Sequence, residues 1–527
     1  MPPASKSKFE TVRIAGGIVP DLTCGLWAAA LLGPWAVVFL QLRFLWSVHD
    51  QYSYAWSVPA LAILLFSLRW RDRPPGERPH HSWWFLVPLL AIFPLRIAEE
   101  ATPDWSVANW SLSLTVLALY LSLLQRAGGR KWLRWFAFPG IFALTSVPWP
   151  QRFEQSLTNG LMRWVARSAA EIAGWFSIPA VQEGNLLVLP AGCLSIEEAC
   201  SGVSSLQATL MVTLFLGDLY RLPAGRRLIL LGSGIILALA GNLFRNVLLC
   251  MVASRYGIRA AAAWHDPAGF SVLLFALMGS LLLALRLRRE RPVAVAAASP
   301  PRVAASIATG VLVWLAAVEA GVEIWYRSHE APHRGWDWSV RWPREAREYR
   351  ESPIADRIQR TLLCNDGRAA NWRGDDGSSW SLYWLRWDPG KTAAQSARQH
   401  RPETCLTGSG AVLKEDLGTR SLQAGRLRFP FHAFAFERGN SRFFVFFCLS
   451  EQGNADLGTP GLLQDYSGWS RLQRAFAGQR NVGQQSLEFI VEGYARAEDA
   501  QASLSRILPT LTEPETGYHA GGKQRGG

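Results

Sequence analysis

The feature that most constrains this chain is a series of long apolar runs between Leu22 and Tyr326, each ended by a short polar loop. Runs of about 20 residues with few charges are typical of helices that cross a bilayer, where a helix satisfies its own backbone hydrogen bonds. We therefore predict a polytopic α-helical membrane protein with about nine transmembrane helices. The expected spans are residues 22–46, 54–70, 82–98, 106–124, 132–148, 203–219, 228–253, 268–287 and 303–326.

The positive charges gather in alternate loops. Loops 69–78 and 126–131 are rich in Arg and Lys, whereas 49–51 and 99–104 contain neither. Basic loops stay on the cytoplasmic side, so we expect residues 1–21 to be cytoplasmic. This distribution also accounts for the net charge of +13 without a nucleic-acid partner.

After Tyr326 the composition becomes that of a soluble α+β domain, which the alternation of spans places outside the cytoplasm. Strands are expected at 380–387, 432–437 and 442–450, and helices at 392–400 and 496–508. The expected organisation is a cytoplasmic N-terminus (1–21), a transmembrane catalytic domain (22–292), a linker with an additional transmembrane helix (293–326), an extracytoplasmic domain (327–513) and a disordered tail (514–527).

Residues 149–200 should emerge on the outer side. Residues at helical spacing predict an amphipathic helix that lies in the membrane surface or against the bundle. Its expected apolar face comprises Leu157, Leu161, Trp164, Val165, Ile172 and Trp175. Residues 184–192 follow as a short β-like run bounded by turn residues, and the chain then reaches Cys200.

Cys200 stands where a polar turn enters the span that begins near residue 203. Backbone N–H groups and the helix dipole favour a thiolate at such a position. The predicted topology brings Arg245, in the outer half of span seven, and His265, in the outer loop 254–267, to the same side. A thiol nucleophile, an imidazole base and a guanidinium that stabilises an oxyanion are the parts of acyl transfer.

Each candidate also has a structural interpretation. Cys200 can be a buried small hydrophobe, and His265 an ordinary surface histidine. Arg245 can form an internal ion pair or reach outward to the interface, although an intramembrane arginine more often marks a functional site. Asn242, one turn before Arg245, can orient that side chain or bond a neighbouring helix. Arg96, near the outer end of span three, is a further candidate.

Three segments carry a resemblance to a known family. Residues 198–205 (EACSGVSS) resemble the cysteine motif of the exosortase/archaeosortase family, 241–245 (GNLFR) its Asn-x-x-Arg motif, and 264–269 (WHDPAG) its histidine motif. The order of the motifs agrees, and the resemblance extends over roughly residues 22–290. It implies a membrane-embedded cysteine transpeptidase or protease with Cys200 as nucleophile, Arg245 as stabiliser and His265 as base.

The resemblance further implies that the substrates are exported proteins with a tripartite C-terminal sorting signal: a short motif such as Pro-Glu-Pro, a transmembrane helix and a basic cluster. Cleavage near the motif would pass through a Cys200 thioester, with no cofactor and no metal. Neither the acceptor nucleophile nor the oligomeric state follows from the sequence. A transporter, or a component of envelope-polysaccharide assembly without covalent catalysis, is the alternative.

Residues 400–410 (HRPETCLTGSG) resemble the His-x-Pro-x-x-Cys motif of the periplasmic domain that is fused to U-type exosortases. His400 and Cys405 could form a second thiol site or bind a metal. They could equally be structural, with Cys405 in a disulfide to Cys364 or Cys448. The disulfide state of these cysteines and of Cys193 stays open.

Overall fold

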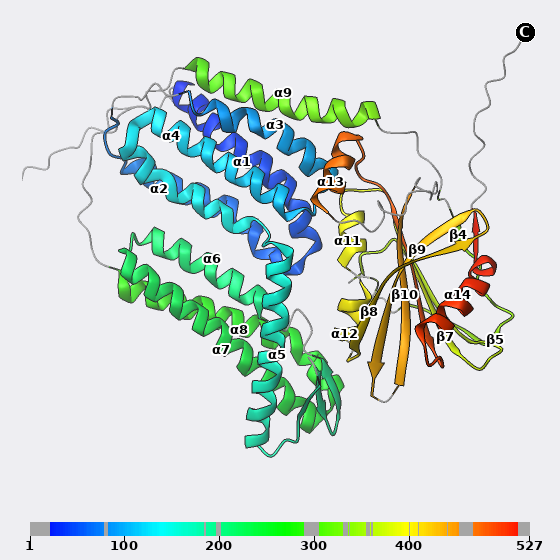
Figure 1. Ribbon diagram of the computed structural model, residues 1–527. Coiled ribbons are helices and arrows are strands. Elements are labelled where there is room, and N and C mark those ends of the chain that lie inside the picture. Colours follow the sequence, from blue (N-terminus) through cyan, green and yellow to red (C-terminus); the bar gives the residue numbers. More distant parts are fainter. Residues whose placement is uncertain are drawn as a thin grey trace, which may run out of the picture.

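The computed structural model describes residues 22–77, 83–183, 186–195, 202–288, 305–329, 336, 338–354, 359, 362–399, 401–408, 410–439, 441–452 and 467–514. The first part of the chain, up to residue 329, forms a helical bundle, and a β-sheet domain lies against one end of this bundle (Figure 1). The predicted N-terminal segment 1–21, the whole of the linker 293–302 and all but the first residue of the 514–527 tail lie outside the described residues.

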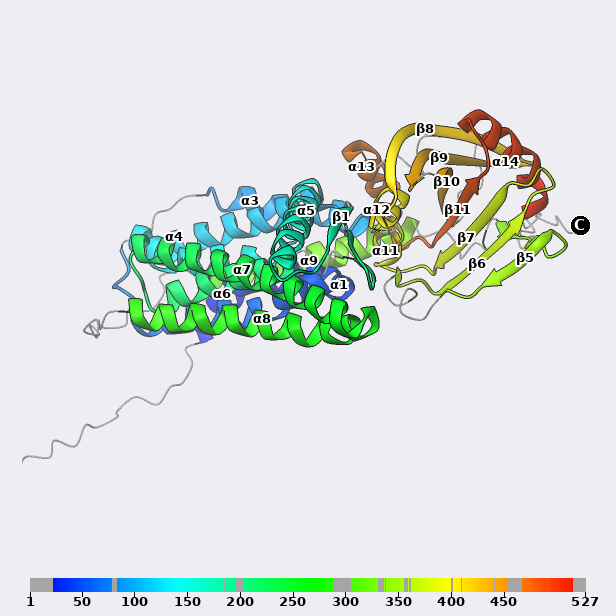
Figure 2. The same ribbon diagram turned by 90° about the horizontal axis from the view of Figure 1, so that it is seen from below.

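The bundle consists of two groups of helices. The first contains α1 (Leu22–Val48), α2 (Val58–Arg71), α3 (Leu86–Ala101), α4 (Ser106–Ala143) and α9 (Ala305–His329). The second contains α6 (Val203–Leu219), α7 (Ala224–Tyr256) and α8 (Ile258–Leu287), and it lies beside α2 and α4 (Figures 1 and 2). The short 3-10 helix η1 (Asp50–Ser57) joins α1 to α2.

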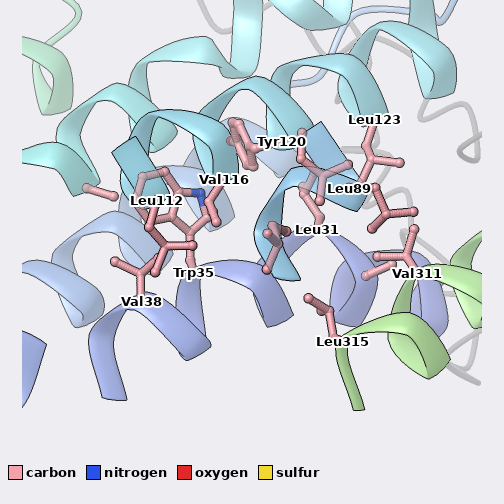
Figure 3. Packing of buried hydrophobic residues seen from close by; sticks show 14 of the residues in the cluster. Leu31, Trp35, Val38, Leu89, Leu112, Val116, Tyr120, Leu123, Val311 and Leu315 are labelled. Carbon is pink, nitrogen blue, oxygen red and sulfur yellow. The ribbon is translucent and has the colours of Figure 1, made fainter. Parts of the chain in front are cut away.

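A large apolar core holds the first group together. Figure 3 shows side chains of α1, α3, α4 and α9 meeting between these helices, with Trp35 and Tyr120 among them. The additional helix α9 belongs to this core, since Val311 and Leu315 pack against α1 and α3. The soluble domain therefore follows a helix that is an integral part of the bundle.

Within the described residues, five helices are long and apolar enough to cross a membrane: 24–48, 106–146, 224–256, 258–287 and 305–329. The helices α2, α3 and α6 are apolar but shorter, with 14, 16 and 17 residues. Predicted spans four and five appear as the single element α4, which breaks at Gly129 (φ 73°, ψ −162°). The structure therefore supports a multi-pass helical membrane protein, and nine spans stay a prediction.

The basic loops of the first and second groups meet at one end of the bundle. Arg69 of α2 forms a buried ion pair with Asp218 of α6, which Arg227 of α7 also contacts at 3.0 Å. Arg221 bonds Asp72 at 2.7 Å. These loops are the ones that the charge pattern assigns to a single side, and we call this end of the molecule the basic end.

The predicted amphipathic helix forms as α5 (Gln151–Trp175) and packs on α7. Its buried face differs from the expected one: Val165 is buried as predicted, but Trp164 and Trp175 are 44% and 80% exposed. Alanines 166, 169 and 173 face the bundle instead, because small side chains let two helices approach closely. The β-like run becomes a three-stranded antiparallel sheet of β1 (Val181–Glu183), β2 (Leu186–Leu189) and β3 (Gly192–Ser195).

The expected outer loop 254–267 is wrong. The helix α7 continues to Tyr256, Gly257 turns the chain with φ 85°, and α8 begins at Ile258. The alanine run 260–263 has the strongest helix propensity available, and glycine accommodates the positive φ of the turn. Residue 265 consequently lies inside a helix, in an antiparallel hairpin with α7.

The soluble domain has a seven-stranded antiparallel sheet in the order β5-β6-β7-β11-β10-β9-β8. The strands are β5 (Arg347–Ser352), β6 (Asp366–Arg373), β7 (Ser379–Trp387), β8 (Val412–Ala424), β9 (Leu427–Arg438), β10 (Ser441–Glu451) and β11 (Gln484–Glu492). The predicted strands and the β9–β10 hairpin are confirmed. A separate pair joins β4 (Trp338–Val340) to β12 (Thr512–Pro514).

Helices cover both faces of this sheet. The helix α14 (Ala497–Leu511) covers an aromatic face, whereas α11 (Ala393–Gln399) and α12 (Pro402–Gly408) lie on the other. Both helices predicted from the sequence, 392–400 and 496–508, are thus confirmed as α11 and α14. A further helix, α13 (Gly468–Phe476), contacts α3 of the bundle.

Buried ion pairs join the soluble domain to the bundle. Asp104, after α3, accepts hydrogen bonds from Arg398 of α11 at 2.9 Å and Arg471 of α13 at 3.3 Å. Glu100 bonds Lys391 at 2.8 Å and Arg480 at 3.2 Å. We call this end of the bundle, opposite the basic end, the docked end. The sheet β1–β3 and the α7–α8 turn lie at the same end (Figure 1).

Candidate functional site

Arg245 is buried in the α7–α8 hairpin, with 6% of the residue exposed. It lies eleven residues before Tyr256, the last residue of α7, and therefore about 16 Å below the tip of the hairpin. An arginine within an apolar helix costs several kcal/mol unless polar partners receive it. The partners in this structure come from α8.

His265 of α8 is the principal partner. One guanidinium nitrogen of Arg245, Nη2, lies 3.0 Å from His265 Nε2 and donates to the backbone oxygen of His265 at 3.1 Å. On the other edge of the ring, His265 Nδ1 lies 2.7 Å from Asp266 Oδ1. The prediction that Arg245 and His265 come together is confirmed, although His265 reaches Arg245 from a helix and not from a loop.

These two contacts indicate how the imidazole is arranged. A carboxylate oxygen only accepts, so Nδ1 carries the hydrogen and donates it to Asp266; a guanidinium only donates, so Nε2 presents its lone pair to Arg245. Asp266 is 94% exposed at its side chain, whereas that of His265 is 21% exposed. An exposed carboxylate consequently orients the ring, and its other nitrogen faces the buried Arg245.

Two glycines allow the chain to approach this pair closely. A Cβ atom at Gly269 would lie 3.1 Å from both Cζ and Nη2 of Arg245, so a larger residue would push the guanidinium aside. Gly202, with φ 84°, stands directly before α6, and a Cβ atom there would lie 2.7 Å from Asn242 Cγ. Asn242 of α7 therefore lies directly against the residue that precedes α6.

Asn242 is itself buried, with 2% exposed, one turn before Arg245 on α7. Its backbone oxygen accepts a hydrogen bond from Asn246 Nδ2 at 2.9 Å. Asn242 thus lies against the residue that precedes α6, and its support of Arg245 stays a prediction. Cys200 lies outside the described residues, two positions before Gly202 in the sequence.

Arg96 belongs to a different cluster. It is 1% exposed and bonds Glu99 at 2.5 Å within α3, and Glu319 of α9 at 2.9 Å. These ion pairs hold α3 to α9 and lead through Glu100 to the soluble domain. The structural interpretation therefore accounts for Arg96.

The second expected thiol site is only partly described. Cys405 is exposed on α12, and His400 lies outside the described residues. Among the described residues no disulfide joins Cys405 to Cys364 or Cys448. Cys448 and Cys364 pack in different apolar clusters, on opposite faces of the sheet, and burial raises the pKa of the Cys448 thiol to about 12. Such a thiol is an inert core residue.

The fold and this polar site define a multi-pass helical membrane protein with a soluble β-rich domain and a buried arginine–histidine pair. Residues 46–283 match the family model described as transmembrane exosortase (Exosortase_EpsH). This match supports placing the membrane part of the chain in the exosortase family. No curated protein and no solved structure matches the chain.

The sequence analysis did not assign roles to Asp266, Gly202 and Gly269. All three stand within or beside the motif segments, and their spacing from His265 or from the start of α6 is a signal from which their roles could have been predicted. A carboxylate directly after a histidine can orient its ring, and a glycine four residues later lies on the same helix face. Gly202 precedes a helix, where a positive φ is common only for glycine.

Proposed function

We propose that this protein is a membrane-embedded cysteine transpeptidase or protease that cleaves C-terminal sorting signals of exported proteins, with Cys200 as nucleophile. The observation that carries the proposal is the Arg245–His265–Asp266 array beside the entrance to α6. Cys200 precedes Gly202 by two residues, and two peptide units span at most about 7 Å. Gly202 lies against Asn242, one turn before Arg245 on α7, and this supports a position of Cys200 on the same side of the bundle.

The chemistry follows from the donors and acceptors. Arg245 Nη2 first releases His265 Nε2, which then takes the thiol proton, and the thiolate attacks the scissile carbonyl carbon to form a C–S bond. The guanidinium of Arg245, a fixed donor that stays charged, stabilises the resulting oxyanion. When the C–N bond breaks, His265 gives its proton to the leaving amine, and a thioester remains on Cys200.

The second half of the reaction repeats these roles. Water or an amine attacks the thioester after His265 accepts its proton, the C–S bond breaks, and the thiolate recovers the proton. Asp266 stabilises the imidazolium during both steps because its carboxylate accepts from Nδ1 at 2.7 Å. This use of a third group to orient the base is the general logic of catalytic triads.

The site fits a substrate that enters from the membrane. The proposed partners are exported proteins with a transmembrane helix followed by a basic cluster, which would lie toward the basic end of the bundle. The proposed location is a bacterial inner membrane, with the docked end and the soluble domain outside the cytoplasm. We further propose that the soluble domain corresponds to the exosortase-associated domain of U-type exosortases.

The test is processing of a reporter that carries a Pro-Glu-Pro motif, an apolar helix and a basic cluster, in cells with wild-type protein or Cys200→Ala. The expected result is a shortened reporter with the wild type and none with the variant, at equal protein levels. Equal processing by both would remove Cys200 as nucleophile and favour transport or scaffolding. Trapping the thioester with hydroxylamine would report the intermediate directly.

A further inference from the structure

A second polar cluster lies at the docked end, on the opposite side of α6 from α7. Gln51 of η1 donates from Nε2 to Gln207 Oε1 of α6 at 3.2 Å and also bonds Glu154 of α5. Tyr52 donates its hydroxyl hydrogen to Glu154 Oε1 at 2.6 Å and accepts from the backbone nitrogen of Trp149 at 3.0 Å. We call Gln51, Tyr52, Glu154 and Gln207 the amide cluster.

The cluster contains a buried donor that its protein neighbours do not use. Gln207 is 2% exposed, and its Nε2 atom has no hydrogen-bond partner among the described residues. The hydroxyl of Thr158, one turn after Glu154 on α5, is 3% exposed and likewise has no partner among the described residues. Buried polar atoms are nearly always paired, so the unused Gln207 donor, which shares the neighbour Gln51 with the Glu154 carboxylate, points to a ligand.

The position of the cluster connects it with the proposed active site. Gln207 lies one turn after Val203, the first residue of α6, and about 6 Å along the helix axis. Cys200 precedes the same helix, with Asn242 of α7 against its entrance at Gly202. The first turns of α6 are therefore flanked by Asn242 of α7 on one side and by the amide cluster on the other.

The chemistry of the cluster selects its ligand. It offers an N–H donor from Gln207 together with a carboxylate acceptor from Glu154. A peptide unit carries one C=O and one N–H, and an extended peptide within a membrane lacks the hydrogen bonds that a helix makes internally. A lipid phosphate fits less well, because the negative charge of Glu154 repels it.

We propose that the amide cluster is a binding subsite for the backbone of an extended polypeptide substrate, held beside Cys200 for attack. Gln207 Nε2 donates to a substrate carbonyl, and Glu154 accepts from a substrate N–H. The subsite rests on the proposed function, since the residues that it binds are the extended residues of the substrate next to the scissile bond. Because it recognises main-chain atoms, it supplies affinity for any sequence that can be extended there.

The test measures binding separately from cleavage. A fluorescent peptide with the Pro-Glu-Pro motif, apolar helix and basic cluster is titrated against the full chain in nanodiscs, with Cys200→Ala to prevent turnover. Adding Gln207→Leu or Glu154→Gln should raise Kd about 5- to 10-fold, the effect of one lost hydrogen bond or more. Gln155→Leu, at an exposed position of α5, is the matched control and should leave Kd unchanged.

A second measurement separates binding from a structural role. Without peptide, Gln207→Leu should change the melting temperature little, because it removes a buried donor that the described neighbours leave unused together with an acceptor for Gln51, whose Nε2 keeps its bond to Glu154. A subsite role predicts weaker binding in a protein of undiminished stability. A lowered melting temperature with unchanged Kd would show that Gln207 is structural and overturn the proposal. If Gln207→Leu fails to fold, the isosteric Glu154→Gln decides by Kd.

The two proposals fail in different ways. If Cys200-dependent cleavage is observed but the Gln207 and Glu154 variants bind the peptide as the control does, the subsite is wrong and the enzyme proposal stands. If binding weakens in these variants but wild-type cleavage does not need Cys200, the subsite stands and the covalent mechanism is wrong. If lipids with phosphate head groups, and not the peptide, occupy the amide cluster in the nanodisc, the peptide assignment is overturned.

Discussion

Replacing Asp104 by asparagine should release the soluble domain from the bundle. Asp104 accepts from Arg398 and Arg471, whose side chains are 10% and 8% exposed. Asparagine keeps the shape but removes the charge, so two buried guanidinium groups lose their shared counter-ion. Breaking a buried pair by removing one partner typically costs about 3–5 kcal/mol. The ratio of docked to released domain should thus fall by about two to four orders of magnitude.

The assay is hydrogen–deuterium exchange of the full chain in nanodiscs. Amides of α13, residues 468–476, contact α3 and should exchange faster in Asp104→Asn, whereas β9 and β10 in the core of the sheet should not change. Arg373→Ala is the control, because its ion pair with Glu348 joins two exposed side chains and contributes little. Unchanged protection of α13 in Asp104→Asn would refute the argument that these ion pairs hold the domain.

The pH dependence of this contribution follows from the carboxyl pKa. Burial by itself raises the pKa of Asp104, but Arg398 and Arg471 hold it well below its usual value. A depressed carboxyl pKa stabilises the docked form fully above the unfolded value near 4, and this stabilisation is lost only as pH falls further. Docking through Asp104 should therefore be constant between about pH 5 and 8.

Three further predictions concern His49 and the candidate site. Burial lowers the pKa of His49, which contacts Gln395 of α11, to about 4. Docking of the soluble domain should therefore weaken by up to about 3 kcal/mol as pH falls from 6.5 to 4, because His49 binds a proton more readily in the released form. Faster hydrogen exchange of α13 at low pH would report this weakening, and His49→Gln should abolish the pH effect. Gly269→Ala should lower reporter processing at least tenfold by displacing Arg245, whereas Gly232→Ala, whose added methyl group meets open space, should not. Equal processing by the two variants would contradict the packing argument. Arg245→Lys should lower processing about 100-fold because a point charge cannot keep both contacts to residue 265, and near-normal processing would count against its role.

The sequence predicted the arrangement of the site better than the elements that build it. Arg245 and His265 do meet, as the alternation of apolar runs required, since that alternation sets which residues share a membrane depth. The loop expected at 254–267 is instead a continuation of two helices around Gly257. Short polar segments between spans do not by themselves reveal whether a chain leaves the helix, because a turn needs only one residue with positive φ.

The apolar face of α5 shows a similar limit. Large residues at helical spacing suggested the buried side, but Trp164 and Trp175 are exposed and the alanines are buried. In a protein surrounded by lipid, a large apolar residue gains nothing by facing another helix, so hydrophobic periodicity does not identify the contact face. Close packing of small residues on α7 decided it.

The sequence by itself determined the membrane part, the soluble domain after Tyr326 and the motif segments, because apolar length and charge alternation are local properties. The tertiary structure decided which polar groups meet. Asp266 orients His265, Gly269 admits the Arg245 guanidinium, and Gln51, from a segment more than a hundred residues away, joins Gln207. Such contacts arise from the packing of helices distant in sequence, and single-sequence patterns carry no record of which helices become neighbours.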